Sequence, residues 1–306
     1  MHSISRTTRP LGLSDATLLA SFERHLYRLM EAGLKQELGS RRLEGLPLCL
    51  AGGCALTIKW NAWLRSSGLF PDVWVPPFPN DAGSAIGAAA ASIVRHGGPA
   101  ALDWSVFSGP ALEPGDTAPA HWESRPCTVE ELARLLHTTR EPVVVLSGRA
   151  ELGPRALGHR SIIAPADGRD MRERLNEIMG REWYRPVAPI CLEDRAADVF
   201  TPGTRDPYMI FEHRVRPEWR DRVPAVVHAD DSARLQTVGP EHPLMYQLLT
   251  EYEALSGLPV LCNTSANLSG SGFFPDAASA MKWEGTNYVW SEGTLHWNSS
   301  AVPATP

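Results

Sequence analysis

Positively charged side chains gather in one glycine-rich stretch of the sequence. The segment GRAELGPRALGHRS, residues 148–161, holds three arginines and three glycines but only one acidic residue. Arginine forms planar, paired hydrogen bonds with phosphate and carboxylate groups, and it stays charged at neutral pH. Three fixed positive charges in one short segment therefore predict a bound anion. That anion could be a protein carboxylate, a nucleic acid or a small phosphate.

Further arginines follow in the same half of the chain. Arg181 and Arg185 stand in GREWYRP, and Arg234 stands in ARLQT. Only three of the 29 basic residues are lysines, which codon usage alone could also explain, and fifteen arginines lie between Arg149 and Arg234. About half of these side chains are expected to be solvated or paired with acids. Arg149, Arg155 and Arg185 stand beside Gly or Pro, and their convergence on one phosphate would stabilise both the bound anion and phosphoryl or adenylyl transfer.

The overall composition narrows the choice of anion and the class of protein. The formal net charge is −6, and no basic stripe interleaves with aromatic residues, which argues against nucleic acid. No histidine pair stands at i, i+4 and no serine lies in a G-x-S-x-G turn, so zinc protease and hydrolase functions have no support. Five scattered cysteines, no leader-like apolar segment and no membrane-length apolar run predict a cytoplasmic protein with reduced thiols.

Three other motifs allow both a ligand-binding and a purely structural interpretation. Gly52 and Gly53 stand between an expected strand and helix, where they form either a nucleotide-binding turn or an ordinary tight turn. Asp81, in FPNDAGS, is either a helix cap or a carboxylate ligand of a metal that bridges nucleotide phosphates. Ser265 and Asn267, in CNTSANLSG, either bind a polar ligand or belong to a plain turn.

Strand-like and helix-like segments alternate along the chain, which predicts an α/β fold with at least partly parallel strands. A proline-rich linker over 109–121 suggests two units, which we place at 1–110 and 122–306 with the linker at 111–121. The expected helices are 14–38 (capped by Ser14 and ended by Gly39), 55–65, 82–94, 128–136, 170–178, 242–255 and 276–283. The expected strands are 46–53, 73–77, 142–148, 185–193, 208–215, 224–229, 233–238 and 259–263, with a hairpin at 287–297.

Several motifs together carry a family resemblance. GGCALTIKWN, VWVPPFPNDAGSAIGAA, GRAELGPRALGHRSI, REWYRPVAPICLE, ARLQTV and PVLCNTSANLSGSGFFPD occur in that order between about Leu48 and Gly293. In this combination the chain resembles the O-carbamoyltransferases of antibiotic and nodulation-factor biosynthesis. The arginines would then belong to a pocket for carbamoyl phosphate and ATP.

The resemblance implies a two-module fold. Residues 1–110 would form the C-terminal lobe of an actin-like (ASKHA-type) ATPase domain, similar to threonylcarbamoyltransferases, and 122–306 a YrdC-like α/β domain. The YrdC-like module would join the carbamoyl group to AMP. The actin-like module would pass it to a hydroxyl of a natural-product intermediate. ATP and Mg²⁺ are the implied cofactors, with Fe²⁺ at a site completed by a partner as a further alternative.

The resemblance also assigns roles to residues. Arg149 and Arg155 would belong to the anion pocket, and Arg185 and Arg234 would hold carbamoyl phosphate and its adenylate. The contacts to the nucleotide end would come from Ser265 and Asn267. Gly52 and Gly53 would form a nucleotide turn in the first lobe, and Asp81 would be a remnant of the metal site.

This chain also departs from the family pattern. Met179 stands where a lysine is usual, Thr57 where an asparagine is usual, and the front of the first module with its histidine ligands is not in the sequence. We therefore expect a protein partner: a front-lobe subunit, a full-length homologue or a second copy of the chain. Two functions fit. The first is an ATP-dependent O-carbamoyltransferase or its carbamoyladenylate-forming subunit; the second is a non-catalytic, carbamoyltransferase-like subunit that stabilises a catalytic partner.

Overall fold

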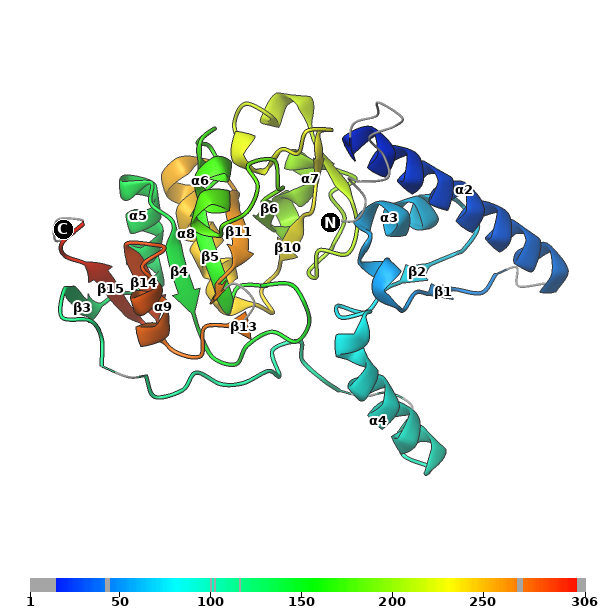
Figure 1. The fold of residues 1–306 in the computed structure, drawn as a ribbon, viewed down its shortest axis with the longest axis horizontal. Coiled ribbons are helices and arrows are strands. Elements are labelled where there is room, and N and C mark those ends of the chain that lie inside the picture. The colour runs from blue at the N-terminus through cyan, green and yellow to red at the C-terminus, as the bar shows by residue number, and fades with distance from the viewer. Residues whose placement is uncertain are drawn as a thin grey trace. The chain divides into compact units, whose positions relative to one another are not determined.

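The computed structural model describes residues 15–41, 45–99, 101, 103–115, 117–268 and 272–301. Contacts between backbone positions group the chain into two compact units (Figure 1). The first consists of Met1–Cys49 and Trp63–Trp74, and the second of Leu50–Ala62 and Val75–Pro306. The boundaries proposed from the sequence, at 110 and 122, stay a prediction.

The first unit is built around one long helix. The helix α2 spans Asp15–Arg41, which confirms the helix expected over 14–38. The end predicted at Gly39 is wrong, since the helix continues to Arg41, and the predicted cap Ser14 lies outside the described residues. Two short parallel strands, β1 (Leu48–Cys49) and β2 (Val73–Trp74), lie where strands were expected.

Short helical segments follow these two strands in the sequence. The 3-10 helix η2 (Gly53–Leu56) precedes α3 (Ile58–Ser66), and η3 (Asp81–Gly83) precedes α4 (Ser84–Arg95). The helices expected over 55–65 and 82–94 are therefore confirmed. None of the helices in the described ranges combines the length and apolar character needed to cross a lipid bilayer.

A mixed eight-stranded sheet organises the second unit. The strand order is β10-β6-β11-β5-β4-β14-β15-β3, with β10/β6 and β14/β4 parallel and the other pairs antiparallel (Figure 1). The expected α/β fold with partly parallel pairing is confirmed, whereas β3 and β5 were not anticipated. The strands are β3 (Trp122–Pro126), β4 (Val143–Leu146), β5 (Arg160–Pro165), β6 (Ala188–Leu192), β10 (Gln236–Val238), β11 (Val260–Ser265), β14 (Tyr288–Ser291) and β15 (Thr294–Asn298).

Helices and central strands enclose the main hydrophobic core. Every residue of β4, β5 and β6 is buried, as expected for strands that are covered on both faces. The helices α5 (Val129–Thr139) and α8 (Pro243–Ser256) pack on each other, and both contact strands of the sheet. With α6 (Met171–Ile178) and α9 (Ala277–Trp283), they confirm the four helices expected in this half of the chain.

Smaller elements surround the large sheet. The strands β7 (Phe200–Thr201), β8 (His213–Val215) and β9 (Ser232–Ala233) form a three-stranded sheet, and β12 (Asn267–Leu268) pairs with β13 (Gly272–Phe273). The strand predicted over 224–229 is wrong, because Pro224–Val226 forms the 3-10 helix η6. Pro224 fixes its own φ and has no N–H to donate to a strand neighbour. The other short helices are η4 (Glu193–Arg195), α7 (Ala196–Val199) and η5 (Pro217–Trp219).

The expected linker is fastened to the second unit by backbone hydrogen bonds. Among its described residues no helix or named strand forms. Ala111 makes an isolated bridge with Arg149, and the Glu113 N–H donates to the carbonyl of Pro275. This segment therefore reaches the arginine-rich loop that follows β4.

The start of α5 offers a direct stability test. Thr128 accepts from the Glu131 N–H and the Glu131 carboxylate accepts from the Thr128 N–H, which together form a capping box. Replacing Thr128 with alanine should lower the free energy of unfolding by about 1 kcal/mol in urea denaturation. Thr138→Ala, inside the same helix, should change it by less than about 0.5 kcal/mol; equal effects would contradict the capping assignment.

Candidate anion-binding site

A cavity of about 240 Å³ in the second unit is lined mainly by polar and cationic side chains. Three chain segments and two single residues meet there, and they bring four arginines into one place. Of the residues proposed from the sequence, Arg155, Arg185, Arg234 and Ser265 line this cavity. The full lining consists of Pro154, Arg155, Ala156, Arg181, Arg185, Pro186, Met209, Arg234, Asn263, Thr264 and Ser265.

The loop that carries Arg155 is closed by the single carboxylate within it. Glu151 is buried, and its Oε1 accepts hydrogen bonds from the backbone N–H groups of Leu157 (2.6 Å), His159 (2.8 Å) and Arg160 (3.2 Å). An ionised carboxylate is a strong acceptor for N–H groups, so these bonds hold the loop against the start of β5. Arg155 lies within the span that Glu151 closes.

The three arginines of this segment have three different environments. Arg160 is fully buried and donates to the backbone carbonyls of Ser147 (2.7 Å), His159 (2.9 Å) and Gly148 (3.0 Å), so it is part of the framework. Arg149 does not line the cavity, and its Nη2 donates to the Ser108 carbonyl (3.3 Å). Of the three, only Arg155 reaches the cavity, so the geometry gives no support to an anion-binding role for Arg149.

The cavity holds more buried positive charge than the described residues neutralise. Among them, no carboxylate forms an ion pair with Arg155 or Arg234, and the Nε atom of each is buried without a hydrogen-bond partner. Burial lowers the pKa of Arg155; burial, followed by repulsion from Arg155 and Arg181, lowers the pKa of Arg234 to about 9. These shifts reflect cations that lack counterions, so the site is suited to an anion.

Arg181 and Arg185 enter the cavity from one loop. Arg181 donates from Nη1 to Thr264 Oγ1 (3.2 Å) and from Nη2 to Ser265 Oγ (3.3 Å). Arg185 is more exposed, and its Nε pairs with Glu182 Oε2 at 2.9 Å. The loop between them is held by Asn176, whose Nδ2 donates to the carbonyls of Trp183 (3.2 Å) and Arg185 (2.8 Å).

Asn267 lies beside the cavity. Its Nδ2 donates to Ser265 Oγ at 2.8 Å, but Asn267 does not itself line the cavity. Ser265 thus receives hydrogen bonds from both Asn267 and Arg181, which places the hydroxyl-rich end of β11 against the arginines.

Asn263, a buried polar residue that lines the cavity, was not predicted from the sequence. Its Nδ2 donates to the Ala156 carbonyl (3.0 Å) and to Gln236 Oε1 (2.7 Å), while Gln236 Nε2 donates to the Leu157 carbonyl (2.8 Å). The available signal was an asparagine that directly follows the apolar run PVLC, because buried polar groups need partners.

The residues proposed for the first lobe are exposed and line neither this cavity nor the second one described below, so their roles stay predictions. Gly52 has φ 102° and its N–H donates to the Pro79 carbonyl (2.7 Å), which fits a tight turn. Gly53 begins η2 and, like Gly52, is exposed. Asp81 is exposed in η3, and no side-chain capping bond is present there. Within the described ranges, no three His, Cys, Asp or Glu side chains are grouped to hold a metal ion.

Met179 also lies outside the cavity lining. It follows α6 directly, and its partly buried side chain packs against the main hydrophobic core. Because a lysine is usual at this position, we expect Met179→Lys to raise carbamoyl phosphate affinity or adenylate formation, and this stays a prediction.

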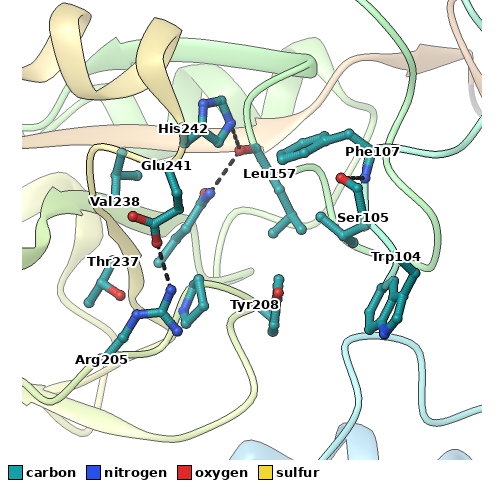
Figure 2. A pocket seen from close by; sticks show the side chains of 14 residues that line it. Trp104, Ser105, Phe107, Leu157, Arg205, Tyr208, Thr237, Val238, Glu241 and His242 are labelled. Carbon is teal, nitrogen blue, oxygen red and sulfur yellow. Dashed lines mark hydrogen bonds and ion pairs between the residues drawn. The ribbon is translucent and has the colours of Figure 1, made fainter. Parts of the chain in front are cut away.

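A second cavity, of about 230 Å³, is lined by Leu157 of the arginine-rich loop and by residues of other segments, among them Phe107 and His242. Figure 2 shows Phe107 and Trp104 on one side of it and the ion pair of Arg205 with Glu241 on the other. His242 donates from Nε2 to the Leu157 carbonyl (3.0 Å), and burial, followed by repulsion from His159, lowers its pKa to about 4. At neutral pH His242 is therefore uncharged, and its hydrogen bond to Leu157 holds the arginine-rich loop in place.

Comparisons with known proteins agree with the resemblance seen in the motifs. The family model described as carbamoyltransferase C-terminus matches residues 133–289, and the one described as carbamoyltransferase N-terminus matches residues 5–90. Nodulation protein U of Rhizobium tropici is 55% identical over 94% of this chain and 50% of its own length. The 3'-hydroxymethylcephem-O-carbamoyltransferase of Amycolatopsis lactamdurans is 44% identical over 75% of this chain and 44% of its own length.

The chain spans about half the length of the curated relatives that it matches. Among solved structures, HypF of T. kodakarensis gives a TM-score of 0.39 at 16% identity, covering 58% of this chain and 23% of its own chain. That likeness is too slight to inform the fold or the site.

The charge excess predicts a gain in stability when one arginine is removed. Arg234→Met should raise the free energy of unfolding by about 1 kcal/mol in phosphate-free buffer, because it replaces an unpaired, largely buried cation with an apolar side chain of similar length. Urea denaturation measures the change. Arg195→Met is the matched control: Arg195 pairs with Asp198 and Glu253, so its removal should not stabilise the protein. Destabilisation by Arg234→Met would contradict the unpaired-cation assignment.

Proposed function

Because the chain belongs to the carbamoyltransferase family, we propose that the arginine cavity binds carbamoyl phosphate. The observation that carries the proposal is the convergence of four guanidinium groups on one cavity, two of them without a carboxylate partner among the described residues. A phosphate dianion would neutralise this charge and accept several charge-assisted hydrogen bonds. Arg155 and Arg234, as the least compensated cations, would be the principal contacts.

The proposed reaction joins the carbamoyl group to AMP. Carbamoyl phosphate, ATP and one water would give carbamoyl adenylate, phosphate and pyrophosphate, so that every phosphoryl group is accounted for. The arginines would stabilise the charge that develops on phosphate oxygens as the bond to pyrophosphate breaks. Ser265 and Asn267, at the end of β11, would meet the nucleotide. Mg²⁺ would then be held mainly by the phosphates of ATP, as is usual for this ion.

For the fold, we propose that the large sheet and its helices form a YrdC-like domain and that residues 1–110 form the rear lobe of an actin-like domain. The order of motifs along the chain supports this division. Asp81 is the one candidate metal ligand from that lobe, and a single exposed carboxylate does not constitute a metal site. No step of the proposed adenylation depends on it.

For the acceptor, we propose a hydroxyl group of a small molecule. The name of the Amycolatopsis lactamdurans relative describes O-carbamoylation of a hydroxymethyl group, and that relative is 44% identical to this chain. The competing proposal is a non-catalytic subunit that binds and stabilises a full-length carbamoyltransferase. The loss of the usual lysine at position 179 favours that second function: Met179 packs against the core and does not line the cavity, so this position contributes no charge to a bound phosphate.

Carbamoyl phosphate binding can be tested with two arginines of the same loop. Arg155→Ala should weaken binding at least tenfold in titration calorimetry, the scale of a lost charge-assisted hydrogen bond. Arg149→Ala removes the same charge a few residues away but outside the cavity. The affinity of this variant for carbamoyl phosphate should therefore stay within about twofold of the wild-type value. If the wild-type chain binds no carbamoyl phosphate, the proposal fails.

The two functions differ in the step after binding. Carbamoyl phosphate with ATP should release pyrophosphate if the chain forms the adenylate. Binding without pyrophosphate release would favour the non-catalytic subunit instead.

Transfer to a hydroxyl is proposed to require a larger assembly. Apolar side chains of the first unit are exposed, among them Phe22 (62%), Leu29 (56%) and Trp74 (54%), which is typical of surfaces that a partner covers. We expect the chain to form a complex through residues 1–94 with a front-lobe protein, a full-length homologue or a second copy. Light scattering measures the association, and a stable monomer that transfers carbamoyl groups alone would overturn this expectation.

A further inference from the structure

One residue that lines the arginine cavity carries a buried acceptor atom without a hydrogen-bond partner among the described residues. Asn263 lines the cavity and is 1% exposed. Its Oδ1 is buried and receives no hydrogen bond from the described residues. A buried carbonyl without a donor costs free energy, so a bound molecule that supplies an N–H or O–H at this point would be favoured.

The orientation of the Asn263 amide follows from its neighbours. The Leu157 carbonyl can only accept, so the Gln236 atom 2.8 Å from it must be the amide nitrogen. Gln236 therefore turns its Oε1 toward Asn263, and the Asn263 atom 2.7 Å away must be nitrogen. Figure 2 shows the Leu157 carbonyl receiving two hydrogen bonds, one of them from His242.

A second acceptor fixes the same nitrogen. Asn263 Nδ2 also lies 3.0 Å from the Ala156 carbonyl, so both of its protons are used. A flipped amide would direct Oδ1 at two acceptors. The chain thus holds Oδ1 as a free acceptor by a fixed sequence of hydrogen bonds.

The surrounding charge shows what kind of donor fits. The other polar groups of the cavity are mostly guanidinium donors, which attract a phosphate and leave no place for a cationic ligand. The ligand must therefore combine an anion with a neutral donor. Carbamoyl phosphate has this combination, since its phosphate is joined through a carbonyl to a neutral NH₂ group.

We infer that Asn263 Oδ1 accepts a hydrogen bond from the NH₂ group of carbamoyl phosphate and so selects a carbamoyl over an acetyl group. This inference rests on the proposed function of the cavity. The four arginines recognise the phosphate that both acyl phosphates share. Asn263 contacts the one group in which they differ, which is NH₂ in carbamoyl phosphate and CH₃ in acetyl phosphate. A methyl group there would leave Oδ1 buried and unsatisfied.

The test compares two ligands of equal charge and nearly equal shape. In titration calorimetry, the wild-type chain should bind carbamoyl phosphate about tenfold more tightly than acetyl phosphate, the scale of one hydrogen bond. Asn263→Ala should bring this ratio to about one, while the affinity for inorganic phosphate changes less than about threefold.

Asn176→Ala is the matched control. Asn176 is another buried asparagine, and it holds the loop of Arg181 and Arg185 through backbone carbonyls. Its removal should weaken both acyl phosphates together and leave their ratio unchanged. If Asn263→Ala does not fold, Asn263→Leu keeps the size of the side chain, removes the same acceptor and should likewise bring the ratio to about one.

Equal wild-type affinities for the two acyl phosphates would overturn the role of Asn263 and leave the anion cavity intact. A preference for carbamoyl phosphate over acetyl phosphate that stays about tenfold in Asn263→Ala would also overturn the role of Asn263. Failure of the wild-type chain to bind either compound or inorganic phosphate would instead remove the proposed function itself.

Discussion

The arrangement of the cavity depends on one buried carboxylate. Glu151 accepts three backbone N–H groups through a single oxygen, and this closes the loop that holds Arg155 at the cavity and Arg160 in the framework. Leu157 is fixed from both sides, because its N–H meets Glu151 while its carbonyl meets Gln236 and His242. The one acid among three arginines thus neutralises none of the cavity's charge. It instead gives the loop a defined shape.

The cavity concentrates charge that is unfavourable for folding. Four cations from three parts of the sequence meet without enough carboxylates, and the pKa of Arg234 is lowered first by burial and then by repulsion from Arg155 and Arg181. The large apolar core that the sheet and its helices enclose offsets this cost. Polar groups that stay unsatisfied in such a setting, including Asn263 Oδ1, are expected where a ligand completes the hydrogen bonding.

The sequence predicted the members of the cavity better than their individual roles. Apolar periodicity and capping residues were enough for most helices, and glycine and proline neighbours identified Arg155 and Arg185. They could not separate Arg149 from Arg155, because both stand in the same motif and only the folded loop brings one of them to the cavity. Asn263 was missed because, although the asparagine after the apolar run PVLC indicates a buried polar group, its hydrogen-bond partners are distant in sequence. The strand β5 was missed because a charged residue, Arg160, begins it and is buried by contacts that are distant in sequence.

The strand order of the large sheet has a consequence for synthesis. Within the described residues, β3 at the sheet edge pairs only with β15, and β15 pairs with β14 on its other side. A ribosome makes residues 122–126 well before residues 294–298, so β3 must wait for nearly the whole second unit to emerge before it gains a partner strand. Most of the other strands can pair earlier, among them β4 with β5 and β6 with β11. Closure of the sheet edge at β3 is therefore a late, long-range event, and a ribosome that stalls before residue 294 would release a chain with β3 unpaired.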